Sequence, residues 1–256
     1  MRDERRGLIA RARDFLEYRI TPALPAKVRR SRLTSPVASF TFDDFPKSAA
    51  TTGAAILERH GAVGTFYAAG ALCGTTSDGV SYFEREELAD LVRRGHEIGD
   101  HTFGHIHVPR HGRAEREQDL ARNARFLVDT LGDVIATSFA FPFGHASPAA
   151  KRFYAARFAS CRGTVPGVNS GALDLGQLKA VGLDEAALAA VDVPALLAQA
   201  RRENGWIIFY THDVSEQPSR FGTRTATFEG VVRACRDAQI EILPMRNALA
   251  RACFGP

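Results

Sequence analysis

Short apolar runs alternate with amphipathic stretches along most of the chain. The apolar runs predict strands at residues 37–42, 63–68, 96–99, 137–141, 158–161, 178–182, 206–211 and 239–243. The stretches between them predict helices at residues 47–60, 84–94, 113–131, 148–156, 184–202, 224–238 and 245–252. This alternation favours a parallel sheet with helical crossovers, either doubly wound or closed as a barrel. In both architectures the chemistry lies where the strands end at their carboxyl edge.

The first of these predicted strands ends in two adjacent carboxylates, within the segment FTFDDFP at residues 40–46. Asp43 and Asp44 are like charges on neighbouring residues, so each raises the pKa of the other unless a positive group lies beside them. One interpretation is that both side chains merely cap the following helix. The other is that a bound cation holds one of them.

The third predicted strand runs into DHTFGH, which carries His101 and His105. A helical turn there would place both imidazoles on one face, where they could bind one ion. Five of the eight histidines of the chain lie within residues 96–111. We interpret the other three, His96, His107 and His111, as structural residues that hydrogen-bond near the strand or in the loop.

Two further predicted strands end in groups suited to catalysis. ATSFAF ends in PFGHAS, whose proline–glycine turn exposes the backbone N–H of Phe143. WIIFY ends in THD, so His212 follows an apolar run just as Asp43 does. Trp206 and Tyr210 lie within that strand, and we interpret them as core residues and not as sugar-stacking platforms.

A carboxylate and two imidazoles form a common ligand set for a catalytic divalent metal. Such an ion lowers the pKa of its bound water from about 15.7 to about 7 in favourable sites. We therefore predict that an ion holds one aspartate of the pair, and that the other stays free beside it as a base.

In order and spacing, these motifs resemble those of the polysaccharide deacetylase family, which contains the NodB homology domain. TFDD at 41–44 resembles its first motif, and HTFGH at 101–105 matches its H-[ST]-x-x-H motif. FAFPFG at 139–144 resembles the third motif, and THD at 211–213 the last. The resemblance runs from residue 37 to about residue 245. It implies an α/β fold, a distorted (β/α) barrel of about seven parallel strands, and a metal-dependent hydrolase that removes N-acetyl groups from sugars.

The resemblance also implies a role for each matching position. It assigns the metal to Asp44, His101 and His105. It assigns the general base to Asp43, the general acid to His212, and oxyanion stabilisation to the Phe143 backbone N–H. These ligands suit Zn²⁺, and Co²⁺, Ni²⁺ or Fe²⁺ would use the same set.

The chain departs from the family pattern in two places. Many members have an arginine in the third motif that contacts the base, but here that position is Ala140, as in a branch with FAYPYG-like motifs. We predict that Arg162 takes over this contact. The aspartate that supports the acid histidine is expected to be Asp174, with Asp213 as the alternative.

Composition and cysteine content are those of an intracellular globular protein. The chain has 256 residues, of which 45% are hydrophobic, enough for one full core. Its four cysteines contain no CxxC pair, which favours free thiols in a reducing compartment. The N-terminus lacks the apolar core of a signal peptide, and no stretch approaches the length of a membrane span. We therefore expect a cytoplasmic protein.

The positive charge is concentrated at the N-terminus. Residues 1–32 hold ten Lys/Arg against four Asp/Glu, a local charge of +6, which leaves −2 of the total +4 for residues 33–256. Apolar residues at helical spacing predict an amphipathic helix in this arm: Leu8, Ala12, Phe15, Leu16 and Ile20. The helix either packs on the body with a solvated basic face, or contacts an anionic membrane or a lipid-phosphate-linked substrate. The rest of the chain adds no basic patch interleaved with aromatics, which argues against nucleic acid.

We therefore predict a basic arm at 1–32 and a catalytic domain at 33–256. The leading hypothesis is deacetylation of an N-acetylated saccharide made in the cytoplasm, for example a lipid-linked or lipopolysaccharide O-antigen sugar, by an enzyme that is peripheral at the inner face of the membrane. A second hypothesis is hydrolysis of a non-sugar amide by the same site. A third is a sugar-binding relative that has lost its activity.

Overall fold

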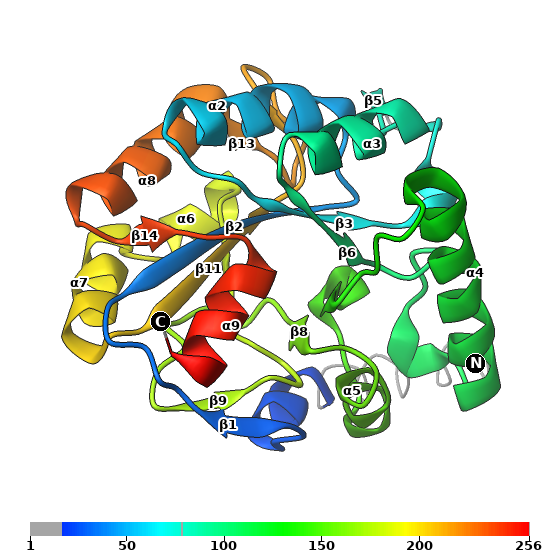
Figure 1. Ribbon diagram of the computed structural model, residues 1–256, viewed down its shortest axis with the longest axis horizontal. Helices are drawn as coiled ribbons and strands as arrows, with labels where there is room; N and C mark the ends of the chain where they lie inside the picture. Colours follow the sequence, from blue (N-terminus) through cyan, green and yellow to red (C-terminus); the bar gives the residue numbers. More distant parts are fainter. Residues whose placement is uncertain (1–16, 78, 256) are drawn as a thin grey trace, which may run out of the picture.

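A curled sheet of parallel strands forms the centre of the protein. In a computed structural model, which describes residues 17–77 and 79–255, seven strands follow the order β10–β11–β2–β3–β6–β7–β8, and β14 pairs with β2 (Figure 1). All pairs in this sheet are parallel. The strands are β2 Val37–Asp43, β3 Thr65–Ala68, β6 Glu97–Asp100, β7 Ser138–Ala140, β8 Ser160–Arg162, β10 Val181–Gly182, β11 Trp206–Thr211 and β14 Glu241–Ile242. The curled half-barrel of parallel strands confirms the predicted fold class.

The edge strands β8 and β10 are linked by an irregular segment, residues 175–180. The amide of Leu178 donates to the carbonyl of Cys161 at 2.8 Å, and the amide of Gly163 donates to the carbonyl of Leu178 at 3.0 Å. This segment therefore continues the curl where no regular strand is present, which is the distortion expected of the barrel.

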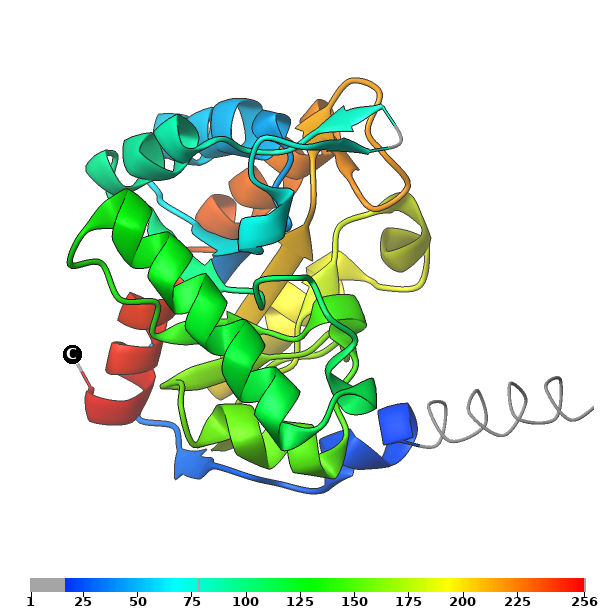
Figure 2. The ribbon, with the colours of Figure 1, turned by 90° about the vertical axis from the view of Figure 1, so that its right-hand side faces the viewer.

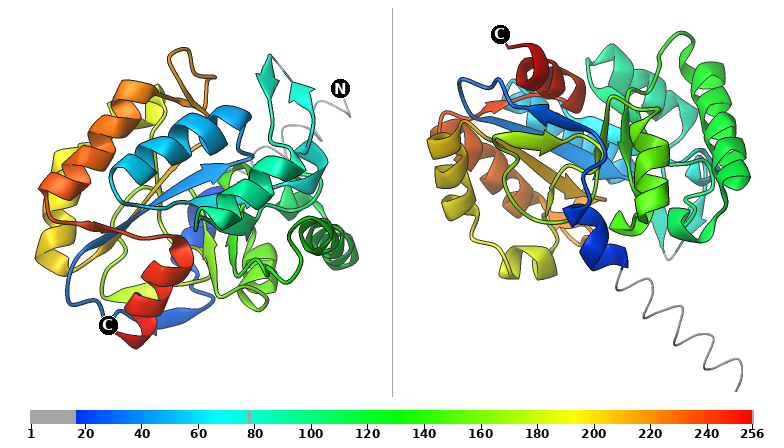
Figure 3. Two further views of the ribbon diagram at one scale, coloured as in Figure 1. Left: turned by 45° about the horizontal axis from the view of Figure 1, so that its top comes forward. Right: turned by 90° about the horizontal axis from the view of Figure 1, so that it is seen from below.

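Helices cover the outside of the curl (Figures 1 and 3). They are α2 Ala54–Arg59, α3 Arg85–Arg93, α4 Arg113–Leu131, α5 Pro148–Ala155, α6 Glu185–Ala189, α7 Val193–Glu203, α8 Thr225–Asp237 and α9 Met245–Phe254. Short 3₁₀ turns lie at η1 Thr21–Ala23, η3 Gly70–Leu72, η4 Val108–Arg110 and η5 Pro142–Gly144. The residues that α3 and α8 bury are apolar, as the sequence periodicity predicts, whereas α4 also buries Arg116, Asp119 and Asn123.

Two predicted helices differ from the structure. The segment 47–60 begins with a π-helical stretch, η2 Ala49–Gly53, before it continues as α2. The segment 184–202 is divided into α6 and α7, because Pro194 is tolerated only in the first turn of a helix. Asp192 caps the new helix by accepting the amide of Ala195 at 2.9 Å.

Several short strands were not predicted. They form the pairs β1 Val28–Arg30 with β9 Ala172–Asp174, β4 Thr76–Ser77 with β5 Val80–Ser81, and β12 Val214–Ser215 with β13 Thr223–Arg224. Residues 28–30, which the sequence assigned to the arm, thus belong to the body through their antiparallel ladder with β9. The β4–β5 hairpin and the segment between β12 and β13 project from the same edge of the molecule (Figure 2).

Most of the predicted amphipathic arm lies outside the described residues. Residues 17–20 are helical, and the Tyr18 ring lies 5.1 Å from the ring of His145. Within the described part of the chain, no helix is both long and apolar enough to cross a membrane.

Strand β2 runs through the middle of the core, and all seven of its residues are buried. Phe40 and Phe42 pack against Phe66, Phe209 and Phe228, and burying each such ring stabilises the fold by roughly 1.5–3 kcal/mol. Trp206 is fully buried and its indole N–H donates to Ser39 at 2.9 Å, which confirms that it is a core residue. The four cysteines are free thiols, as predicted.

Candidate active site

The carboxyl ends of the sheet strands surround a cavity of about 940 Å³. The predicted acid, base and ligand side chains all line it: Asp43, Asp44, His101, His105 and His212. Phe143 lines it too, and so does Tyr210, which the sequence had placed in the core. Residues separated by up to about two thirds of the chain thus meet because parallel strands present their carboxyl ends at one edge.

The backbone is strained around this cavity. Seven non-glycine residues in the described part of the chain have positive φ, and five of them lie here: Asp44, Phe45, Thr102, His105 and Phe143. Such conformations cost about 1–3 kcal/mol each and persist only where the surroundings enforce them. At the end of β2 the turn at Asp44, with φ of 56°, sends the two neighbouring carboxylates to different partners.

Asp43 is paired with Arg162, which lies at the end of β8. The guanidinium of Arg162 donates to the Asp43 carboxylate, and both groups are buried. The rings of Tyr67 and Tyr210 lie 5.0 and 5.1 Å from the guanidinium carbon. Burial alone would raise the pKa of Asp43, but Arg162, His101 and His212 together hold this pKa below its usual value. Asp43 is therefore an ionised carboxylate inside the protein.

Asp44 faces the two imidazoles instead. Its Oδ1 lies 3.6 Å from His101 Nε2 and 3.4 Å from His105 Nε2, and one ligand atom from each of the three residues falls within 4.8 Å of the others. Oδ1 is buried and has no hydrogen-bond partner among the described residues. A buried oxygen without a donor costs free energy, which a cation at this point would recover.

The two imidazoles are in the neutral form that binds a cation, whereas Asp44 must lose a proton to do so. Burial lowers the pKa of His101 to about 3 and that of His105 to about 4, so both imidazoles are neutral near pH 7. Burial and the neighbouring Asp43 raise the pKa of Asp44 to about 8. His101 Nδ1 lies 2.8 Å from the carbonyl of Ala140 and must donate to it, which leaves the Nε2 lone pair toward Asp44.

A loop, and not the helical turn considered from the sequence, brings His101 and His105 together. Thr102 and His105 have φ of 64° and 47°, outside the helical range. Asp119 on α4 holds the loop from behind, because its two carboxylate oxygens accept the amides of Phe103 at 2.7 Å and Gly104 at 3.0 Å. The four-residue spacing of His101 and His105 did indicate a shared site. What brings them together is the loop conformation that Asp119 stabilises.

His212 is oriented by a backbone carbonyl. Its Nδ1 lies 3.2 Å from the carbonyl of Phe221, so Nδ1–H donates to that oxygen and Nε2 is the free nitrogen. Asp213 does not take this place; it accepts the backbone N–H of Ser219 at 2.9 Å and the hydroxyl of the same residue. Asp213 therefore fixes the segment that carries Phe221, and it affects the orientation of His212 only indirectly, through the Phe221 carbonyl.

Asp174, the predicted support of the acid, makes its contacts elsewhere. Its carboxylate pairs with the buried Lys151 at 2.7 Å and accepts the amides of Ala26 at 3.2 Å and Lys27 at 3.0 Å. These contacts fix the segment before β1 to the body. The prediction that Asp174 supports His212 is therefore wrong, because β9 carries Asp174 to the side of the barrel where the chain enters.

The remaining histidines include structural ones, as predicted. His96 Nδ1 accepts the amide of Gly64 at 2.9 Å, and its Nε2 lies 2.9 Å from Glu58. His111 Nδ1 lies 3.1 Å from the carbonyl of His107, within the loop.

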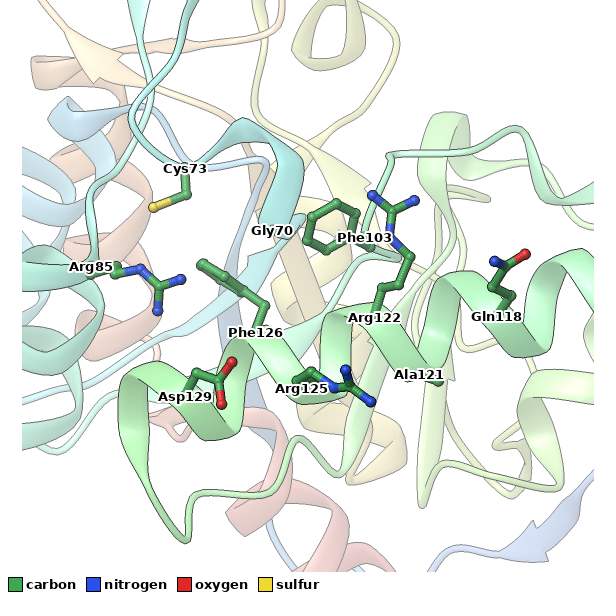
Figure 4. A pocket seen from close by; sticks show the side chains of 10 residues that line it. All are labelled: Gly70, Cys73, Arg85, Phe103, Gln118, Ala121, Arg122, Arg125, Phe126 and Asp129. Atoms are coloured by element: carbon green, nitrogen blue, oxygen red, sulfur yellow. The ribbon is translucent and has the colours of Figure 1, made fainter.

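A second cavity, of about 610 Å³, lies behind Phe103 and next to α4 (Figure 4). Arg122 lies over the ring of Phe103 at 4.1 Å, and Arg85 over that of Phe126 at 4.8 Å. Among the described residues that line it, Asp129 is the only carboxylate and there is no histidine. The lining of this second cavity therefore lacks the acid–base groups that the first one has.

The family model of polysaccharide deacetylase matches residues 30–158, just over half of the chain. The chain belongs to the polysaccharide deacetylase family. The matched region includes Asp43 and Asp44, the histidine loop and Phe143, and ends before Arg162 and His212. No curated protein matches the sequence significantly.

Solved structures of similar fold include deacetylases of this family. One is described as a T48 deacetylase with substrate, with 17% identity over 87% of this chain and 95% of that chain, and a TM-score of 0.59. Another is the Bc1960 peptidoglycan N-acetylglucosamine deacetylase, with 13% identity over 90% and 95% of the two chains and a TM-score of 0.57. A third is a mutant of BA3943, a CE4 family pseudoenzyme, with restored activity, at 13% identity over 88% and 71% and a TM-score of 0.55. At these identities the likeness shows the fold alone.

Proposed function

We propose that this polysaccharide deacetylase relative is an active, metal-dependent hydrolase that removes an N-acetyl group from a saccharide. The proposal is supported mainly by the different partners of the two neighbouring carboxylates at the end of β2. Asp43 is ionised against Arg162, while Asp44 faces His101 and His105 with a buried oxygen that lacks a donor. An inactive relative has no need to maintain both arrangements side by side.

The three residues fit a divalent metal ion. Two neutral imidazoles and one carboxylate, each with a ligand atom within 4.8 Å of the others, are a donor set used by Zn²⁺, and Co²⁺, Ni²⁺ or Fe²⁺ accept the same ligands. Asp44, His101 and His105 would hold the ion. Such an ion, when bound, polarises a carbonyl oxygen and makes a coordinated water more acidic.

In this scheme Asp43 is the general base. Arg162 keeps it ionised, and its carboxylate borders the same cavity as the proposed ligands. An ionised carboxylate in this position can accept the proton of the attacking water. Its hydrogen bond to Arg162 keeps one carboxylate oxygen from coordinating the metal ion.

Two further groups complete the reaction. The backbone N–H of Phe143, at a residue with φ of 59°, is proposed to donate to the oxygen that gains negative charge as water adds to the amide carbonyl. His212 acts as a general acid only in its imidazolium form, with Nδ1–H held by the Phe221 carbonyl; in that form it is proposed to give the Nε2 proton to the leaving amine and become the neutral imidazole. Hydrolysis would then yield acetate and a free amino sugar.

The proposed substrate is an N-acetylated saccharide, in line with the peptidoglycan N-acetylglucosamine deacetylase that shares the fold. We propose more narrowly that this saccharide is a biosynthetic intermediate made in the cytoplasm, for example a lipid-linked or O-antigen sugar. The local charge of +6 in residues 1–32 supports this, since such a segment is attracted to anionic lipid or to a carrier diphosphate.

Mass spectrometry of N-acetylated saccharides incubated with the protein tests the activity. The expected result is the mass change of one acetyl group replaced by hydrogen, together with free acetate, and its loss in Asp43→Asn. A panel of non-sugar acetamides separates the saccharide proposal from amide hydrolysis in general. Acetate release confined to the non-sugar amides would contradict it.

Charge-neutralising substitutions in the arm test the membrane proposal. Deletion of residues 1–32 is unsuitable because residues 28–30 pair with β9. Replacing Arg5, Arg6, Arg11 and Arg13 by Gln should abolish flotation with vesicles containing anionic lipid. Unchanged flotation of this variant would contradict a role of the basic arm.

A further inference from the structure

One wall of the active-site cavity is built by residues 216–222, the segment between β12 and β13. Asp213 fixes this segment by accepting the amide and the hydroxyl of Ser219. Gly222 passes so close to Asp213 that a Cβ there would lie 2.2 Å from Oδ1, so only glycine fits. Asp213 does not line the cavity itself, so it fixes the segment from behind. On the cavity side the guanidinium of Arg220 lies 5.4 Å from the centroid of the Phe221 ring.

Phe221 is the aromatic side chain that this segment presents to the cavity, beside Pro218. The residue is 55% exposed, and the centroid of its ring lies 5.5 Å from that of the His212 imidazole. A phenylalanine left about half exposed forgoes only part of the roughly 1.5–3 kcal/mol that full burial contributes. Phe143, 56% exposed, lies in the same cavity beside His105, with its centroid at 4.5 Å. The two exposed rings therefore flank the cavity, one on the ligand side and one on the acid side.

The proposed reaction determines which part of the substrate lies against Phe143 and which part lies against Phe221. The carbonyl oxygen of the acetamide points to the proposed ligands and the Phe143 N–H, and the leaving nitrogen points to His212. The carbon bonded to that nitrogen belongs to the sugar. The sugar ring must therefore lie on the His212 side, where Phe221 lies.

We propose that Phe221 is the stacking platform for the sugar ring that carries the acetamido group, which rests on the deacetylase function proposed above. The C–H face of a pyranose is apolar, and an exposed phenyl ring binds such a face while the hydroxyl groups stay in water. The β4–β5 hairpin, through Ser77 and Val80, lines the same cavity, so the sugar is bound between the two projecting ribbons.

Phe221 then has two separable tasks. Its backbone carbonyl orients His212, and its ring binds the sugar. Phe221→Ala removes the ring but keeps the carbonyl, so sugar binding should weaken while the carbonyl still accepts from His212. Because the ring is exposed, its removal should leave the fold intact.

The test compares Phe221→Ala, Phe221→Tyr and the control Phe254→Ala, whose ring is 80% exposed on α9 and does not line the cavity. For the tetramer of β-1,4-linked N-acetylglucosamine, Phe221→Ala should raise KM about tenfold with kcat little changed. Phe221→Tyr should restore KM, and Phe254→Ala should match the wild type. For a small N-alkylacetamide without a sugar ring, Phe254→Ala should match the wild type, and the loss of kcat/KM in Phe221→Ala should be several-fold smaller than the loss for the tetramer.

Saturation-transfer NMR in an Asp43→Asn background measures the contact without turnover. Adding Phe221→Ala should remove transfer to the C–H protons of the tetramer. Acetate release from the tetramer with unchanged KM and unchanged transfer in Phe221→Ala would overturn this inference alone. A wild-type protein that cleaves the small acetamide but neither cleaves nor contacts the tetramer would overturn the inference and the saccharide function together.

Discussion

Ala140 and Arg162 are register partners across β7 and β8, and the side chain of Arg162 reaches Asp43 from this neighbouring strand. In the pattern that the sequence resembles, an arginine at the position of Ala140 contacts the base. Parallel strands lie about 4.8 Å apart, so a guanidinium from the adjacent strand can occupy much the same space. The positive partner of the aspartate pair is therefore retained at a different position in the sequence.

Arg162→Met should raise the pKa of Asp43, because burial and its neighbouring carboxylate would then act without a counter-charge. We expect lower kcat, an acidic limb of the pH–rate profile displaced to higher pH, and unchanged metal content. Control variant Arg157→Met removes a surface arginine that pairs with Glu117. An acidic limb at the wild-type position would contradict the assignment of Arg162.

The same variant should also lose stability, by about 3–5 kcal/mol near neutral pH, because it leaves a buried charge unpaired. In the wild type the pKa of Asp43 is lowered, so its pairing stabilises the protein above the unfolded pKa and the stabilisation is lost as pH falls. The difference in unfolding free energy between the two proteins should therefore shrink in acid. Urea titrations at several pH values measure it.

Asp43→Asn should retain the metal and lose turnover by about 10²- to 10⁴-fold, the usual contribution of a general base. The amide still hydrogen-bonds but takes no proton. Metal analysis and acetate release on the same preparation separate the two effects. Loss of the metal in this variant would show that Asp43 is a ligand.

Metal affinity of the apo-protein should depend on pH through Asp44 alone. The pKa of Asp44 is raised to about 8, whereas both imidazoles are already neutral above pH 5. The association constant should therefore rise about tenfold per pH unit from pH 5 to pH 8 and then level off, as one proton is displaced. Chelator competition measures this slope, and a slope of two or of zero would contradict these protonation states.

Asp213→Ala and Asp174→Ala should affect the protein in different ways. The first frees the segment that carries Phe221, so His212 loses its fixed orientation and kcat falls about tenfold or more. The second removes the carboxylate that pairs with the buried Lys151, which still donates to the Thr21 carbonyl; it should cost about 1–3 kcal/mol of stability with kcat unchanged well below the melting temperature. Calorimetry and acetate release, measured on both variants, test these two predictions. A fall in kcat in Asp174→Ala would show that Asp174 supports His212 after all.

The strands of the central sheet could be predicted because most lie in short, mainly apolar runs between turn residues, and all seven residues of β2 are buried. The short pairs could not, since β1, with all three residues exposed, has no apolar pattern and is fixed by its partner β9. The division of the helix at Pro194 was visible in the sequence, as an aspartate followed by a proline in a helical stretch.

The proposed ligands and base could be predicted from motifs at strand ends, but their supports could not. Asp119 binds the histidine loop from a helix, and the Phe221 carbonyl binds His212 from a segment without a motif. Backbone groups have no sequence signature. From the sequence, a single aspartate in a helix is most simply interpreted as a solvent-exposed charge. These contacts follow only from the tertiary structure.

The central claim is that one divalent ion is held by Asp44, His101 and His105 while Asp43 stays out of the ligand set. Anomalous diffraction from crystals grown with Zn²⁺ tests it most directly. We predict a single strong peak at about 2.0–2.2 Å from one atom of each of the three residues, with Asp43 still bound to Arg162. A peak elsewhere, or one that Asp43 coordinates directly, would contradict the account.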